Sequence, residues 1–419
     1  MVRILLVTFF VVIFSSSSLG NDTKTGIFSS RFKSLKTMVA DEFMSSPVLR
    51  LGTDDRIIVS FDEIGEDYSD LSYRLVHCNS DWSVSNLVES EYLDGFNTED
   101  IDDYAYSTNT FVHYVNYRIE IPSAGMRPLL SGNYLLQVYD REEPDKVLLQ
   151  TRFKVVEPII SIDGKVSSRT DKGVNDRWQQ LMLSVTGDEI EKCNPYQDIK
   201  IEIEQNNRES TRRFLRAPLR VEGKRVVYEH QPELLFPASN EYRRFESVST
   251  QFPGMNVDST KYSGNNYHTW LKTDYPRAEH NYEYDRTQHG RFLVREYNAT
   301  DSDIGADYII VHFFLDTPEF IGQDIYIDGE FTYNRFNRFN RMEYNGETGG
   351  YELSMPVKQG AYNYQYVSIP KGENRADTTS LVEGDKYETE NEYNISVYLR
   401  RPGERYDRLI GYQTIYSTN

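Results

Sequence analysis

The chain has 419 residues and a net charge of −19, with 65 acidic against 46 basic side chains. Such a charge repels nucleic acid and anionic lipid, which argues against nucleic-acid-binding and membrane-surface functions. The 32 tyrosines and 21 phenylalanines exclude a disordered acidic chain, because aromatic residues are enriched in strands and interfaces.

Residues 1–20 have the pattern of a secretory signal peptide. Arg3 is a positive charge ahead of an apolar run that is too short to span a bilayer, and Ser18 and Gly20 are the small residues expected at a cleavage site. We therefore predict cleavage after Gly20 and export. No later apolar run is long enough to cross a membrane, so we expect a soluble protein without direct membrane insertion.

Alternation of apolar and polar residues recurs along the chain and predicts half-buried strands. One short region, residues 32–45, could instead form one or two helical turns. The continuous apolar run at 308–315 predicts a strand that is buried on both faces. The alternating segments lie at 115–121, 179–185, 199–205 and 324–331. We predict an all-β protein.

Two polar, turn-rich segments suggest the domain boundaries. Residues 131–158 read as a hairpin that ends at Glu157-Pro158, as at the close of an immunoglobulin-like sandwich. Residues 299–307 form the second such segment and precede a new predicted strand. We predict tandem immunoglobulin-like β-sandwiches at 30–157, 158–304 and 305–419, the middle one being the hardest to interpret.

The chain has two cysteines, Cys78 and Cys193. A protein of this size has a core large enough to fold without cysteine cross-links. One long-range disulfide is conceivable, but the two residues fall in different predicted domains, which favours two separate thiols.

The most unusual string is HCNSDW, which contains His77, Cys78, Asn79, Asp81 and Trp82. His77 and Cys78 end a predicted strand, so their side chains diverge and cannot act as a nucleophile–base pair. No histidine or cysteine recurs at the spacing of a metal site. We predict a structural role, in which the asparagine and the aspartate stabilise a turn and Trp82 fills the core.

No other pattern predicts a catalytic, cofactor or metal site. Asp100, Asp102 and Asp103 could bind a calcium ion, but they lack the glycine and the terminal glutamate of an EF-hand loop. No phosphate-binding loop or hydrolase motif occurs where its chemistry requires it. A glycosidase leaves no short signature, so a β-rich hydrolase stays a remote alternative.

The loop 331–341 interleaves aromatic residues with arginines in an otherwise acidic protein. Aromatic residues and arginine dominate the energetics of protein interfaces. The loop could therefore contact a partner, or its rings could be partly buried and its arginines paired with nearby acids. The candidate contact residues are Tyr333, Arg335, Phe336, Arg338, Phe339 and Arg341.

Several uncommon strings together resemble a known family. Tyr73–Phe96 carries Y-x-L-x-HCN-x-DW-x-x-S-x-L-x-x-x-EYL-x-GF, and SGNYLLQVY, TPEFIGQDIYIDGEFTYN, KQGAYNYQYV and TENEYNISVYLRRPGERYDRLIG follow in order. This combination resembles the plug protein of the type IX secretion system of Bacteroidota, over nearly the whole exported chain. HCNSDW is then a family signature.

The resemblance implies tandem immunoglobulin-like domains in the periplasm. It also implies a non-enzymatic protein that binds the periplasmic opening of a large outer-membrane translocon barrel and closes it when idle. The last domain resembles, more loosely, the early-set sandwiches that bind glucans, so a secreted or periplasmic glycan-binding protein is the alternative. Trp82, Trp178 and Trp270 all precede residue 305, which weakens that alternative because glucan-binding modules usually stack tryptophan on sugar.

Overall fold

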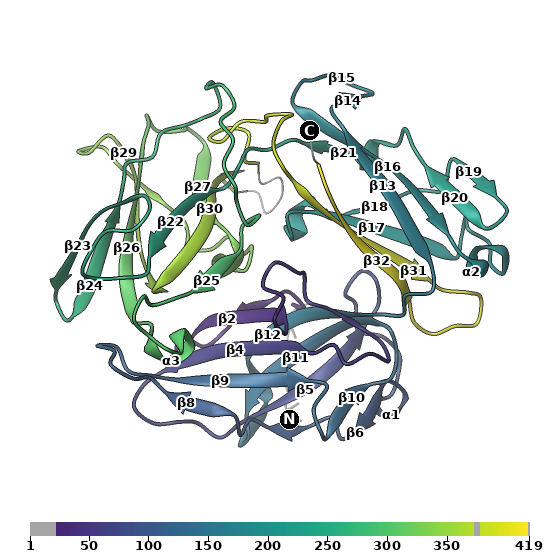
Figure 1. The fold of residues 1–419 in the computed structure, drawn as a ribbon, viewed down its shortest axis with the longest axis horizontal. Coiled ribbons are helices and arrows are strands. Elements are labelled where there is room, and N and C mark those ends of the chain that lie inside the picture. Colours follow the sequence, from purple (N-terminus) through teal and green to yellow (C-terminus); the bar gives the residue numbers. More distant parts are fainter. Residues whose placement is uncertain (1–21, 373–377, 418–419) are drawn as a thin grey trace, which may run out of the picture.

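The computed structural model describes residues 22–372 and 378–417, so the predicted signal peptide lies outside the described residues. Strands make up 49% of the structure and helices 5%, and none of the described sheets closes into a barrel. The predicted all-β sandwich class is confirmed. Three two-layered sandwiches surround a common centre, with domain 1 at the bottom of Figure 1, domain 3 at the left and domain 2 at the right.

Domain 1 (residues 22–157) packs two sheets with the orders β1-β12-β11-β5-β7 and β2-β4-β9-β8. Its core joins the inner faces of both sheets, including Phe61, Tyr117, Tyr134 and Phe153. The elements are β1 Gly26–Ile27, β2 Phe32–Val39, β3 Val48–Arg50, β4 Ile57–Ile64, β5 Leu71–Cys78, α1 Glu89–Tyr92, β6 Leu93–Gly95, β7 Glu99–Asp100, β8 Tyr104–Tyr106, β9 Tyr114–Ile121, β10 Met126–Pro128, β11 Gly132–Asp140 and β12 Glu143–Val156.

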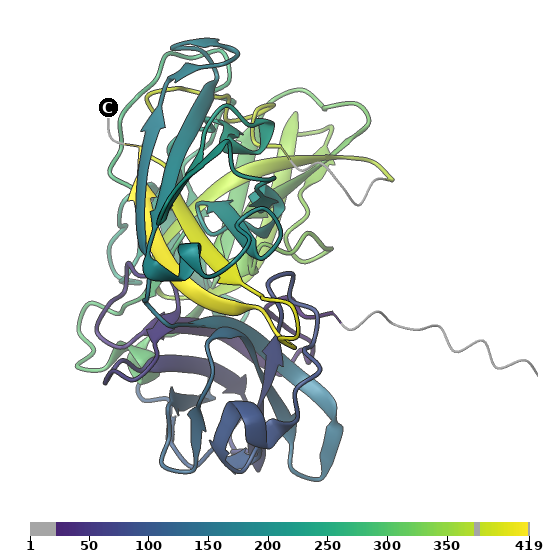
Figure 2. The same ribbon diagram turned by 90° about the vertical axis from the view of Figure 1, so that its right-hand side faces the viewer.

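Domain 2 is discontinuous and comprises residues 158–241 and 388–417. Its sheets have the orders β13-β16-β20-β19 and β18-β17-β31-β32. Figure 2 shows the C-terminal hairpin, in yellow, beside the teal strands of this domain. The elements are β13 Ser161–Ser167, β14 Arg169–Thr170, β15 Gly173–Val174, β16 Trp178–Thr186, α2 Asp188–Glu191, β17 Ile199–Gln205, β18 Arg213–Phe214, β19 Arg220–Glu222, β20 Arg225–Tyr228, β21 Leu235–Pro237, β31 Glu392–Leu399 and β32 Arg408–Tyr416, with 3₁₀ turns at Glu209–Thr211 and Pro232–Leu234.

Domain 3 (residues 242–387) is inserted into domain 2. Its sheets have the orders β22-β30-β25, with β27 also on β30, and β23-β24-β26-β29-β28. The elements are β22 Arg243–Ser247, β23 Val257–Ser263, β24 Asn266–Leu271, β25 Phe292–Val294, α3 Ser302–Gly305, β26 Tyr308–Asp316, β27 Gln323–Asp328, β28 Glu343–Asn345, β29 Gly350–Lys358 and β30 Gly360–Pro370, with a 3₁₀ turn at Glu330–Thr332.

The strand pairing corrects three sequence-based expectations. The boundary predicted between residues 304 and 305 cuts through domain 3, because β24 pairs with β26, and it separates β17 from its partner β31. Residues 32–45, a candidate helix, instead contain strand β2, whose inward side chains join the domain 1 core. Strand β26 is buried on one face only, since its alternate side chains are partly exposed.

Each of the three domain interfaces contains a buried ion pair. These pairs lie between side chains that are far apart in sequence, so they fix the domains relative to one another. They are Lys154–Glu202 between domains 1 and 2 (2.9 Å), Lys358–Asp62 between domains 1 and 3 (2.7 Å), and Arg291–Glu392 and Arg208–Asp328 between domains 2 and 3 (2.8 and 3.0 Å).

Candidate functional site

The HCNSDW turn lies at the end of β5, and His77 is buried within it. The ring Nδ1 lies 2.9 Å from Ser85 Oγ, and Nε2 lies 3.2 Å from the Ser131 carbonyl oxygen. Burial lowers the pKa of His77 to about 4, so the ring is neutral at pH 7. Both nitrogens therefore have structural partners, and the ring is not positioned as an accessible base.

Cys78 points away from His77, as the strand geometry predicts. It packs in a small cluster with Trp82 and Leu135, and burial raises the pKa of its thiol to about 12. A thiol that stays protonated is a poor nucleophile. Cys78 and Cys193 are both free thiols.

The turn that follows is held by side-chain bonds. Asp81 Oδ1 accepts the Ser83 backbone N–H at 3.0 Å, and Asn79 Nδ2 donates to Ser83 Oγ at 3.1 Å. Trp82 has a left-handed backbone (φ 68°) and is 5% exposed. The Arg152 guanidinium lies 4.3 Å from the centroid of its ring. These contacts hold the turn in place and bury the Trp82 ring.

The same turn also forms the joint between domains 1 and 2. Ser80 donates its N–H and its hydroxyl to Asp407 Oδ2 at 3.0 and 2.7 Å, and Lys200 also binds this carboxylate. The Tyr406 ring meets the His77 ring edge-on at 5.2 Å. Sequence reasoning missed Asp407, although it lies in the last of the strings that carry the family resemblance. The signature therefore joins two domains as well as closing a turn.

The loop 331–341 divides into an inner and an outer part. Tyr333 packs against the domain 1 core, and its hydroxyl accepts the Leu35 N–H at 3.1 Å. Arg335 binds the chain near its beginning, including Asp22 at 2.7 Å. Both residues thus make contacts within the molecule.

The outer part of the loop faces solvent. Arg338 and Arg341 are exposed, and Phe339 is 65% exposed with the Arg338 guanidinium 4.8 Å from its ring centroid. Phe336 is half-buried against Tyr326. Of the six predicted contact residues, Arg338, Phe339 and Arg341 present the most accessible surface.

The acidic loop of domain 1 does not bring its three aspartates together as one site. Asp100 accepts the Ser72 hydroxyl at 2.7 Å and pairs with Arg141 at 3.1 Å. Among residues 22–372 and 378–417, no group of three or more histidine, cysteine or acidic side chains has the geometry to hold a metal ion.

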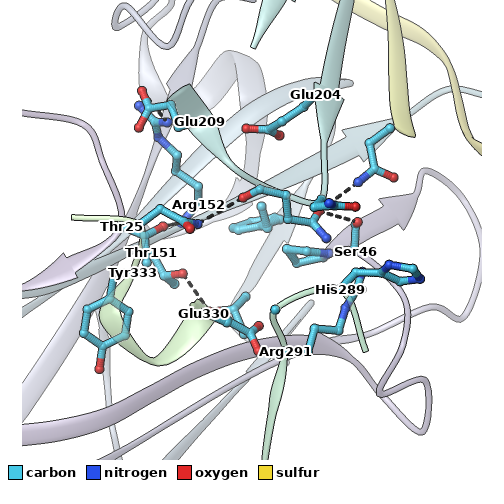
Figure 3. A pocket seen from close by; sticks show the side chains of 18 of the residues that line it. Thr25, Ser46, Thr151, Arg152, Glu204, Glu209, His289, Arg291, Glu330 and Tyr333 are labelled. Atoms are coloured by element: carbon cyan, nitrogen blue, oxygen red, sulfur yellow. Dashed lines mark hydrogen bonds and ion pairs between the residues drawn. The ribbon is translucent and has the colours of Figure 1, made fainter. Parts of the chain in front are cut away.

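A polar cavity of about 190 Å³ lies where the three domains meet (Figure 3). Arg152 comes from domain 1, Glu204 from domain 2, and His289, Arg291 and Glu330 from domain 3. Burial, reinforced by the neighbouring Glu202, raises the pKa of Glu204 to about 7, and burial lowers the pKa of His289.

Most charges around this cavity are neutralised by other protein groups. Arg291 binds both oxygens of Glu392 at 2.8 Å, and Glu330 pairs with Lys36. The cavity thus resembles a polar junction between domains rather than a set of convergent catalytic groups.

Trp270 belongs to the same sheet as β26, so the expectation that the last domain has no tryptophan of its own was wrong. Its ring is stacked on His312 at 4.6 Å with an interplanar angle of 7°. Lys261 lies 5.6 Å from the ring centroid. Because His312 covers one ring face, Trp270 does not offer that face to a sugar.

The family model described as type 9 secretion system plug protein 1st domain matches residues 32–157, which lie within domain 1. Residues 32–157 are thus a first domain of the type IX secretion system plug protein family. The match supports a plug role in type IX secretion, and this family is not known to be enzymatic.

The whole chain is also similar to a solved structure, the crystal structure of a hypothetical protein from Parabacteroides merdae ATCC 43184. The two are 38% identical, with a TM-score of 0.91, and the alignment covers 94% of this chain and 99% of the other. No curated protein matches the chain. The three-domain arrangement is therefore shared beyond the segment that the plug family model covers.

Proposed function

We propose that this protein is a non-enzymatic periplasmic plug, which binds and closes the periplasmic opening of the outer-membrane translocon barrel of the type IX secretion system when no substrate is passing. The observation that carries the proposal is the plug family match over residues 32–157. The signal peptide pattern in residues 1–20 supports export to the periplasm. No helix in the described part of the chain has the length and apolar character needed to cross a membrane.

The buried ion pairs at all three domain interfaces support the proposal on physical grounds. A stopper must resist deformation, and sandwiches joined only by flexible linkers would move independently. Here each domain is fixed to both others, for example by Lys358 and Asp62, whose side chains are 1% and 0% exposed. The protein can therefore present one rigid surface to a channel.

The exposed part of the loop 331–341 is the candidate contact with the barrel. Arg338, Phe339 and Arg341 combine cationic and aromatic surface on a strongly acidic molecule. Such residues contribute most to binding when they become buried at the centre of an interface.

The first experiment is a gentle detergent pull-down of the tagged protein from its native host, with export idle or active, followed by mass spectrometry. We expect one very large outer-membrane barrel, enriched when export is idle. Recovery of polysaccharide without a barrel would contradict the proposal and favour glycan binding.

The contact loop is tested separately. We expect Arg338→Glu combined with Phe339→Ala to weaken barrel association about tenfold or more, as loss of interface anchors does. The matched control is Arg169→Glu with Val174→Ala, an exposed arginine and an exposed apolar residue (64% exposed) on a hairpin of domain 2. Equal binding by both variants would remove the loop from the interface.

A further inference from the structure

The segment 22–26 lies against side chains of all three domains, among them Gln150, Arg152, Glu209 and Arg335, which together are called the groove below. Gln150 of domain 1 and Arg335 of domain 3 both donate hydrogen bonds to it. Glu209 of domain 2 lies 3.5 Å from the ammonium of Lys24. Thr25 also lines the central cavity, where it is labelled in Figure 3. A short piece of chain thus contacts every domain.

The groove binds this segment chiefly through its main chain. The backbone carbonyls of residues 22–25 all accept hydrogen bonds from side chains of the groove. Gln150 Nε2 donates to the carbonyls of residues 22 and 24 at 2.6 and 2.9 Å, Arg152 Nε to that of residue 23 at 2.7 Å, and Arg335 Nη2 and Nε to those of residues 24 and 25 at 2.6 Å each. A groove that binds the backbone carbonyl oxygens of a peptide accepts an extended peptide largely regardless of its side chains.

Side chains of the segment also contribute. The Asp22 carboxylate forms an ion pair with Arg335 Nη1 at 2.7 Å. Arg152 donates to the Thr23 hydroxyl from Nη2 and to the Thr25 hydroxyl from its backbone N–H, both at 3.1 Å. The groove therefore favours a carboxylate at position 22 and hydroxyl side chains at positions 23 and 25.

The segment is held like a ligand rather than like a core strand. Strand β1 pairs with the edge of β12 at only two positions, Gly26↔Gln150 and Ile27↔Leu149. Asp22, Lys24 and Phe28 are exposed. With the segment in place, Gln150 is 1% exposed and the Arg152 side chain 14% exposed, so the segment covers side chains that bind it.

We propose that this groove is a peptide-binding site, occupied here by the chain's own segment 22–26, and that an extended acidic segment of a partner protein takes the same place by strand addition to β12. Arg335 favours an acidic occupant by charge, whereas Arg152 is already paired with Glu209 at 3.3 Å. Occupation by a partner removes Asp22 from Arg335 and so replaces an internal contact with an intermolecular one. This site goes beyond the barrel-plugging proposal and does not depend on it.

The test uses the exported chain shortened to begin at Ile27 and a fluorescent synthetic peptide of residues 22–26. We expect saturable binding to the shortened chain and little binding to the intact chain, whose groove is filled. Arg335→Ala in the shortened chain should weaken binding about tenfold or more, because it removes charge-assisted bonds. A peptide with Asp22→Ala should bind more weakly, because it loses the ion pair with Arg335, whereas one with Lys24→Ala should bind nearly as well as the original.

No binding by a shortened chain that melts cooperatively overturns the proposal. A dimer of the intact chain in sedimentation, lost on shortening, also overturns it and makes a second copy the occupant. Hydrogen exchange of the intact chain decides the matter if the shortened chain does not fold. Amides of residues 23–26 should exchange much faster than those of the β11–β12 ladder, and equal protection means that the segment is a fixed part of the fold.

Discussion

Trp82 supports the turn after β5 in two ways, through its buried ring and through its left-handed backbone. We expect Trp82→Ala to lower the free energy of unfolding by about 3–5 kcal/mol, the usual cost of removing a buried aromatic ring. Trp82→Gly should be no less stable than Trp82→Ala, because glycine adopts a φ of 68° without the steric cost that alanine carries. Urea unfolding followed by circular dichroism measures both. A stability equal to that of the original protein would show that the ring contributes no packing energy.

At the residue scale, the sequence predicted local geometry well and distant contacts poorly. The divergence of His77 and Cys78 follows from strand geometry, and the structure agrees with it. The role of Arg335 could not be predicted from the sequence, because its partners lie in residues 22–25, far earlier in the chain. Nothing in a local pattern of arginines and aromatic residues distinguishes an intramolecular contact from an exposed one.

At the scale of elements, the C-terminal hairpin β31–β32 completes a sheet that begins with β17. A chain cut at residue 304 should therefore leave domains 2 and 3 unfolded, because each loses central strands. Replacing residues 242–387 by a short Gly-Ser linker should instead leave domains 1 and 2 folded. The ends are close, since the Glu390 N–H donates to Glu241 Oε1 at 3.0 Å. Protease resistance and the dispersion of amide signals in NMR spectra distinguish the truncated chain from the chain with the linker. Similar protease resistance in both chains would contradict this topology.

Period-two alternation predicted the individual strands closely, as at 199–205, where β17 occupies the same residues. The discontinuity of domain 2 could not be predicted in this way. Strand pairing depends on which sheet edges meet in space. The sequence of an edge strand does not indicate which other strand will pair with it. Boundaries placed at turn-rich segments therefore recovered the end of domain 1 near Val156, where β12 ends, but not the insertion of domain 3.

At the scale of the whole molecule, the arrangement of the domains depends on charges that are removed from water. Lys154 of domain 1 and Glu202 of domain 2 are 12% and 2% exposed in their side chains. One oxygen of Glu202 binds Lys154, and the other has no hydrogen-bond partner. The charge of Glu202 and of its neighbours raises the pKa of Lys154 against the opposing effect of its burial. The pair thus holds the two domains together only while both charges are present.

Removing one partner should cost more than removing both. We expect Lys154→Met to lower the free energy of unfolding by about 3–5 kcal/mol, because it leaves Glu202 as an unpaired buried charge. Adding Glu202→Leu should recover most of this loss, since a buried ion pair replaced by apolar residues is often neutral. A double-mutant cycle by urea denaturation measures the coupling, and purely additive losses would show that the pair does not couple the domains. Small-angle X-ray scattering of Lys154→Met tests the structural consequence. If the Lys154–Glu202 pair keeps the plug rigid, the single variant should expand and bind the barrel more weakly. The double variant should regain the compact shape and the original affinity for the barrel.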